Sequence, residues 1–141
     1  MAARFPLIVD GSGTPAIKEI VSGDVLDLTG LQVKLGTEAT LSDGATIAWD
    51  VSASPIASVT LGGNRTLSAP TNAVGSGQYI SLLVIQDGTG SRTLTWNAAY
   101  EFTADTAPTL TTTASKGDLF TFRYNGSKWL EVGRNLNLTL S

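Results

Sequence analysis

Short runs of alternating apolar and polar residues recur along this chain about every 8 to 12 residues, with glycine, proline, asparagine or aspartate between them. A period of two places the apolar side chains of a strand on one face, whereas a helix needs a period near 3.6. No stretch of the sequence has a convincing helical period. The pattern therefore predicts an all-β fold, specifically an antiparallel two-sheet sandwich, jelly-roll-like, of about eight strands.

A few segments carry most of this signal. Ile47, Trp49 and Val51 share one predicted face of a strand. Residues 79–86 (YISLLVIQ) form the longest apolar run, and its continuity predicts a central strand covered on both faces. Residues 119–133 predict a hairpin, because an Asn-Gly pair separates two runs rich in aromatic and apolar residues.

The sequence predicts three parts. Residues 1–30 form an N-terminal arm with short strands, residues 31–44 are a connecting segment, and residues 45–141 form the sandwich. The arm is too short to bury its own apolar positions. We therefore expect it to pack on the main domain, on a copy of itself or on another protein.

Composition argues against several classes of function. Only 15% of the residues are charged and the net charge is −3, so the clustered Lys and Arg of a nucleic-acid partner are not expected. The sequence has no histidine and no cysteine, which removes the commonest general base and all thiolate metal ligands. No apolar segment approaches the roughly 20 residues of a membrane span, and no export signal of adequate length is expected.

Motifs that would carry cofactor or metal chemistry are better explained as turns. Residues 11–16 (GSGTPA) match the letters of a dinucleotide-binding fingerprint, but no predicted helix follows them. Asp10, Asp43 and Asp87 each precede a glycine, yet none has the spacing of a calcium loop. We therefore expect no catalytic residue, no metal site and no cofactor.

Aromatic residues are the remaining candidates for a binding surface. Trp49 and Trp96 fall on the apolar faces of their strands, so burial is expected for both. Tyr100 and Trp129 adjoin loops and are the better candidates for exposed contacts with a glycan or a partner protein. Aromatic rings suit such contacts because they offer a large apolar face together with a polar tip.

Several stretches, in this order, resemble a known module: IKEIVSGDVLDLTG, VTLGGNRTLSAPTN, YISLLVIQDGTGSRTLTWNAAYEF and APTLTTTASKGDLFTFRYNGSKWLEVG. The module is a β-sandwich of tailed-phage structural proteins, present both in head decoration proteins and in tail-fibre segments, and the resemblance covers about residues 4–133. It implies a component of the phage virion that is made in the host cytoplasm. No catalytic residue is carried over from it.

The leading interpretation is a capsid cement protein on the exterior of the phage head. In this interpretation the arm lies extended over the major capsid protein or a neighbouring subunit and pairs with it by strand addition. The expected partners are the major capsid protein and the chain itself, as a homotrimer implied by the resemblance alone. Modest contacts at many identical sites would add by avidity. The predicted docking anchors of the arm are Phe5, Leu7, Val9, Ile17, Ile20 and Leu28.

Two alternatives stay open. In the first, the chain is a receptor-binding tail-fibre or tip protein that recognises a host-surface glycan through Tyr100, Trp129 and neighbouring loops. In the second, Glu101 and Asp105 form the carboxylate pair of a glycan hydrolase. Because aspartate is common in turns for local hydrogen bonding alone, we expect that the chain is not an enzyme.

Overall fold

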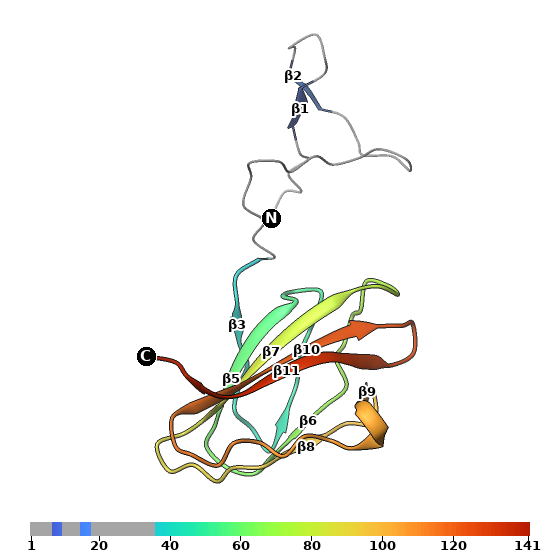
Figure 1. Ribbon diagram of the computed structural model, residues 1–141. Helices are drawn as coiled ribbons and strands as arrows, with labels where there is room; N and C mark the ends of the chain where they lie inside the picture. Colours follow the sequence, from blue (N-terminus) through green and yellow to red (C-terminus); the bar gives the residue numbers. More distant parts are fainter. Residues whose placement is uncertain (1–6, 10–14, 18–35) are drawn as a thin grey trace. The chain divides into compact units, whose positions relative to one another are not determined.

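The computed structural model describes residues 7–9, 15–17 and 36–141, and it confirms an all-β chain (Figure 1). The chain separates into two units, Met1–Val33 and Lys34–Ser141, which are described in turn. Among the described residues, no helix is long and apolar enough to cross a membrane.

In the first unit, β1 (Leu7–Val9) and β2 (Pro15–Ile17) pair as antiparallel strands, with Leu7 opposite Ile17. Half of the predicted docking anchors, namely Leu7, Val9 and Ile17, therefore belong to this strand pair. The other anchors lie outside the described residues: Phe5, Ile20 and Leu28. The docking role of all of them stays a prediction.

The second unit begins with a β-solenoid of about three coils. Each coil contributes one strand to a large sheet and then one strand to a small sheet, so successive strands alternate between the two sheets. In chain order the strands of the coils are β3 (Ala39–Thr40) and β4 (Thr46–Ile47), β5 (Ile56–Leu61) and β6 (Arg65–Leu67), and β7 (Tyr79–Gln86) and β8 (Leu94–Trp96).

Strands of neighbouring coils run parallel, which contradicts the predicted antiparallel jelly-roll sandwich. Ala57 lies opposite Leu82 in the β5–β7 pair, and Thr66 lies opposite Thr95 in the β6–β8 pair. The prediction was wrong because alternation and turn spacing indicate where strands occur but not which strands they pair with. A parallel pair needs a connection that returns the chain to its starting end, and here the strand in the opposite sheet is part of that return.

An antiparallel hairpin extends the large sheet beyond the third coil. β10 (Lys116–Tyr124) pairs with β7 on one side and with β11 (Trp129–Thr139) on the other, which confirms the predicted hairpin. The side chain of Asn125 closes the turn by accepting a hydrogen bond of 2.7 Å from the backbone N–H of Lys128. Short β9 (Tyr100–Glu101) pairs in parallel with the start of β11, and the 3-10 turn η1 (Thr103–Asp105) follows it.

The core lies between the two sheets and consists of alternate side chains of their strands. Ile47, Trp49 and Val51 are all buried, as their shared face predicts. In β7, buried side chains alternate with less buried ones, so only one of the two faces that were expected to be covered is fully closed. Phe120 and Phe122 of β10 complete the core from the hairpin. Each such large apolar side chain contributes about 1.5–3 kcal/mol through burial.

Ion pairs hold the corners of the coils. Asp43 pairs with Arg65 at 2.7 Å, and the Arg65 side chain lowers the pKa of Asp43. Asp87 pairs with Arg92 at 2.8 Å. Both aspartates therefore support turns, while Asp10 lies outside the described residues.

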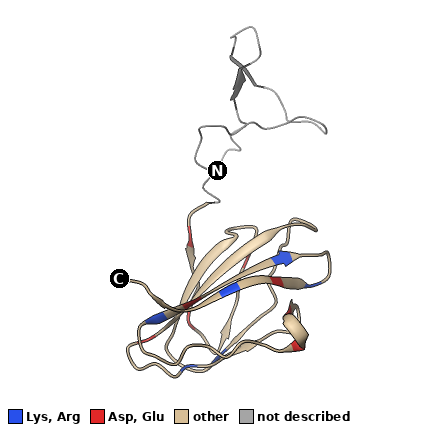
Figure 2. Cartoon of the chain, viewed as in Figure 1, with Lys and Arg blue, Asp and Glu red and all other residues tan. Residues whose placement is uncertain are grey.

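Within the described part of the chain, charged residues are scattered over the strands (Figure 2), and no group of three or more Asp, Glu, His or Cys gathers as metal ligands would.

Candidate functional site

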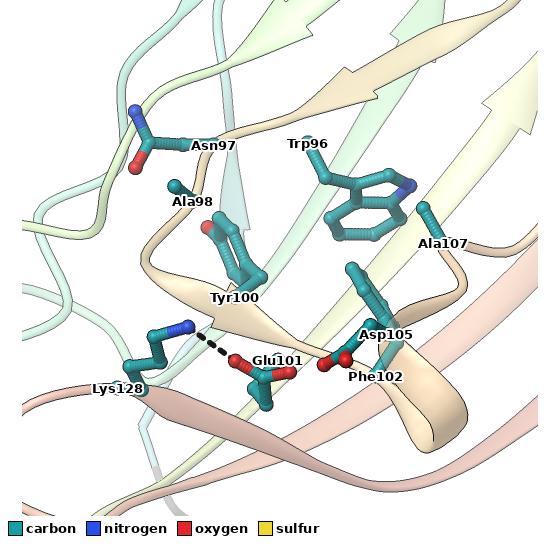
Figure 3. Close-up of a pocket in the computed structure, with 9 residues that line it drawn as sticks. All are labelled: Trp96, Asn97, Ala98, Tyr100, Glu101, Phe102, Asp105, Ala107 and Lys128. Atoms are coloured by element: carbon teal, nitrogen blue, oxygen red, sulfur yellow. Dashed lines mark hydrogen bonds and ion pairs between the residues drawn. The ribbon is translucent and has the colours of Figure 1, made fainter.

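A pocket of about 280 Å³ opens beside the third coil, where β8, β9, η1 and the turn before β11 meet (Figure 3). Aromatic side chains form one part of its wall, and charged side chains gather beside them. The lining residues are Trp96, Asn97, Ala98, Tyr100, Glu101, Phe102, Asp105, Ala107 and Lys128.

A turn at Asn97 brings these segments together. The backbone N–H of Asn97 donates to the carbonyl oxygen of Leu67 in the preceding coil at 3.1 Å. Its side-chain oxygen accepts from the N–H of Ala99 at 2.9 Å, and its carbonyl oxygen accepts from the N–H of Tyr100 at 3.0 Å. The carbonyl oxygen of Ala99 then accepts from the N–H of Trp129 at 2.8 Å. The chain after β8 is thereby folded back onto the hairpin, which places β9 beside β11.

Trp96 is the centre of the aromatic wall. Its ring centroid lies 5.3 Å from that of Tyr100, 5.2 Å from that of Phe102 and 5.0 Å from that of Phe120, and in each pair the rings meet edge to face. Such pairs contribute about 0.5–1.5 kcal/mol beyond the area they bury. Trp96 itself is only half-buried. The pocket is therefore backed by a firmly packed aromatic cluster, and part of the indole remains available at its surface.

The carboxyl groups of Glu101 and Asp105 lie side by side, and Lys128 forms an ion pair with Glu101 (Figure 3). The backbone reaches this arrangement through Ala104 and Asp105, whose φ angles of 55° and 53° are in the left-handed region. A hydrogen bond from Lys128 lowers the pKa of Glu101, whereas hydrogen bonding to Glu101 and repulsion by it raise the pKa of Asp105. With both carboxyls ionised, the group carries more negative than positive charge.

Two buried polar atoms of the pocket lining have no hydrogen-bond partner among the described residues: the indole Nε1 of Trp96 and the hydroxyl oxygen of Tyr100. A third buried atom, Oε1 of Glu131, lies 2.6 Å from Nε of Arg134 and is therefore ion-paired. Burial raises the pKa of the Tyr100 phenol, so its hydroxyl keeps the proton. Leaving a buried polar group unpaired costs about 1–3 kcal/mol. The wall thus holds unused hydrogen-bonding capacity.

The structure corrects the expected exposure of Tyr100 and Trp129. Only 4% of Tyr100 and 2% of Trp129 is exposed, because Tyr100 packs on Phe122 and Trp129 packs on Tyr124. Their positions next to loops predicted that both side chains would be exposed. Packing against aromatic side chains of β10 buries both instead. Tyr100 nevertheless lines the pocket, whereas Trp129 belongs to the core. A glycan or partner contact of either residue stays a prediction.

Sequence reasoning found part of this site and missed the rest. Glu101 and Asp105, considered as a carboxylate pair, do come together at the pocket. Trp96 was assigned to the core and in fact stands at the boundary between core and pocket. Lys128 was not identified, because its partner Glu101 is 27 residues away along the chain and no local pattern joins them. The Trp96-Asn97 step, a strand end followed by a turn residue, is the signal that could have located this corner.

A protein-family model described as "Putative phage tail fibre C-terminal domain" matches residues 40–129. The match covers well over half of the chain and includes every residue that lines the pocket. No curated protein and no solved structure matches the chain.

Proposed function

Because the chain belongs to the phage tail fibre C-terminal domain family, we propose that it is a receptor-binding domain that attaches the fibre to a glycan on the host surface. The observation that carries this proposal is the pocket at Trp96 within the matched region, where aromatic rings stand beside charged and unpaired polar groups. A few convergent polar groups on an apolar wall are typical of a ligand site.

The family match corrects the interpretation of the chain as capsid cement. A tail-fibre family places the chain in the phage virion as a tail-fibre component, and it supports the receptor-binding alternative instead. The major capsid protein was expected as a partner only because of the cement interpretation. With that interpretation corrected, no reason to expect this partner remains. Association of the chain with further copies of itself stays a prediction.

The chemistry of the pocket suits a sugar. An aromatic face such as that of Trp96 packs against the apolar C–H groups of a sugar ring, and carboxylates such as those of Glu101 and Asp105 accept hydrogen bonds from its hydroxyls. The Lys128 ammonium adds hydrogen-bond donors at the same rim. Each site needs only modest affinity if several copies of the domain engage one cell, because linked contacts add by avidity.

We propose that the pocket binds its glycan without cleaving it. Glycosidases hold their two carboxyl groups about 5–5.5 Å apart when they retain configuration and about 6.5–9.5 Å apart when they invert it. Glu101 and Asp105 instead lie side by side (Figure 3), and Lys128 engages Glu101. With the carboxyls side by side, neither is placed across a glycosidic bond from the other. Incubation with host polysaccharide should therefore release no new reducing ends.

Competition for adsorption tests the receptor-binding proposal. Full-length chain added to host cells should reduce adsorption of the phage, and the variants Trp96→Ala and Lys128→Ala should compete less well. Lys116→Ala and Tyr79→Ala are matched controls, since both residues lie outside the pocket and Tyr79 is 52% exposed. Circular dichroism confirms that each variant is folded. Full competition by both pocket variants would show that another surface contacts the host.

A further inference from the structure

Buried polar side chains of the described residues are paired except at the pocket. Asp118, which is 2% exposed, accepts three hydrogen bonds, and Gln86, which is 3% exposed, makes two with the backbone of Arg92. The exceptions are Trp96 Nε1 and the Tyr100 hydroxyl, and both belong to residues that line one cavity. Because native proteins satisfy nearly all of their buried polar groups, this concentration points to a ligand that completes them.

The charges at the rim favour a ligand without negative charge. Two carboxyl groups, those of Glu101 and Asp105, stand beside one ammonium group, that of Lys128, which is already paired with Glu101. An acidic sugar would bring a further anion against this excess of carboxyl groups, and like charges at contact distance repel. The hydroxyl groups of a neutral sugar would instead donate hydrogen bonds to the same carboxylates.

We infer that the pocket selects a neutral sugar ring, one that carries several hydroxyl groups and no carboxylate, phosphate or sulfate; this inference rests on the proposed function. One sugar hydroxyl pairs with the Tyr100 hydroxyl, neighbouring hydroxyls donate to Glu101 and Asp105, and an apolar face of the ring lies against Trp96. A volume of about 280 Å³ is close to the lower end of ligand pockets, roughly 300–1,000 Å³, and suits one ring better than a long oligosaccharide.

A second cavity of the described residues offers no comparable chemistry. It has a volume of about 240 Å³ and lies between β8 and the loop at residues 108–112. Its charged side chain, Arg92, is already paired with Asp87 at 2.8 Å, and neither of the unpaired buried atoms lies in its lining. The sugar site is therefore assigned to the pocket at Trp96.

A glycan array probed with the full chain tests the charge selectivity. It should display neutral hexosides, N-acetylhexosaminides, uronic acids and sialosides. We expect retention of neutral glycans, and binding to their acidic counterparts that is weaker by roughly tenfold, as expected for one added like charge at a partly exposed rim. Preferential retention of acidic glycans, or retention of no neutral glycan, overturns the inference. Receptor binding as such would survive the first result, provided that the pocket variants still lose competition for host adsorption.

Calorimetry on two variants locates the contacts, with a retained neutral hexoside and the uronic acid that differs from it by one carboxylate as the probes. Tyr100→Phe should weaken binding of the neutral probe about tenfold, since it removes one buried hydrogen bond to the ligand. The double variant Glu101→Gln/Asp105→Asn should narrow the preference for the neutral probe over the acidic one. The matched control is Tyr124→Phe, because the Tyr124 hydroxyl donates to the Gly126 carbonyl oxygen at 2.9 Å outside the pocket, and its Kd should not change.

Either of two results would contradict the assigned contacts: an unchanged Kd in the Tyr100 variant, or an unchanged preference in the double variant. Failure of the proposed function gives a different pattern. In that case the chain does not compete for phage adsorption to the host, and no pocket variant alters its attachment to cells, whichever glycan the array retains.

Discussion

Trp49 follows the small-sheet strand of the first coil and Trp96 ends that of the third coil, and their surroundings differ. Trp49 is 1% exposed, and its indole N–H donates to the carbonyl oxygen of Ser54 at 2.9 Å. The Ser54 hydroxyl in turn donates to the carbonyl oxygen of Thr37 at 2.8 Å, so this corner satisfies its own polar groups. Trp96 is half-buried, and its indole N–H has no partner within the described part of the chain.

This difference distinguishes the corner at Trp49, whose polar groups stabilise the fold, from the corner at Trp96, whose polar groups are unpaired and available to a ligand. At the first coil every polar group just described is engaged, and removing one of them should reduce stability. At the third coil the chain departs into β9 and η1, and the residues that carry the unpaired groups line a pocket. There, removal of a polar group should change binding more than it changes folding.

The largest expected effect comes from removing Trp49. Trp49→Ala empties a fully buried position, so the free energy of unfolding should fall by about 3–5 kcal/mol. Urea denaturation followed by circular dichroism measures this change. Trp96→Ala removes the same side chain from a half-buried position and should cost clearly less. Equal losses in the free energy of unfolding of the two variants would contradict the stated difference in burial between Trp49 and Trp96.

An intermediate effect is expected at Asp118. Its carboxylate accepts hydrogen bonds of 2.7 Å from the N–H and from the hydroxyl of Thr111, and one of 2.9 Å from the N–H of Asn137. Asp118→Asn removes the charge and turns one acceptor into a donor, so we expect a loss of about 2 kcal/mol in the free energy of unfolding. Asp105→Asn, at the exposed pocket rim, should leave stability nearly unchanged. The same denaturation experiment compares the two variants, and a larger loss for Asp105 would contradict its assignment.

The smallest expected effect is on the stability of two tyrosine variants, one at the pocket and one outside it. Tyr100→Phe removes a buried hydroxyl without a partner, so the thermal midpoint should stay equal or rise slightly. Tyr124→Phe removes a hydroxyl that donates to the Gly126 carbonyl oxygen, and it should lower stability by up to about 1 kcal/mol. Differential scanning calorimetry measures both. A lower midpoint for the Tyr100 variant would mean that the folded chain already uses this hydroxyl.

Strand positions were predictable because they depend on local alternation. The face shared by Ile47, Trp49 and Val51 and the hairpin of β10 and β11 follow from patterns of a few residues, and the structure confirms both. The coils also correspond to a repeating pattern in the sequence. Turn-rich corners at Asp43, Gly63 and Asp87 each precede a short strand of the small sheet, at a spacing of about 20 to 25 residues that suits a repeating coil.

The site was predictable only in part. Glu101 and Asp105 were recognisable because they are close in sequence and acidic, whereas the contribution of Lys128 depends on the hairpin that brings it to Glu101. Exposure of Tyr100 could not be judged from its neighbours, because Phe122 and Trp96, which cover it, belong to other strands. The burial of Tyr100 is decided by packing against other strands, whereas alternation predicted burial within a strand such as the one at Trp49.

The sequence by itself determined that the chain is all-β, where its main strands lie, and which aromatic and acidic residues were available for binding. Only the tertiary structure decided that the strands coil in parallel, that Trp129 is buried in the core, and that Trp96, Tyr100 and Lys128 meet at one pocket. The physical reason is the distance along the chain over which each kind of interaction acts. Alternation and turn chemistry act over a few residues, whereas strand pairing and the closing of a pocket depend on contacts between segments far apart in the chain.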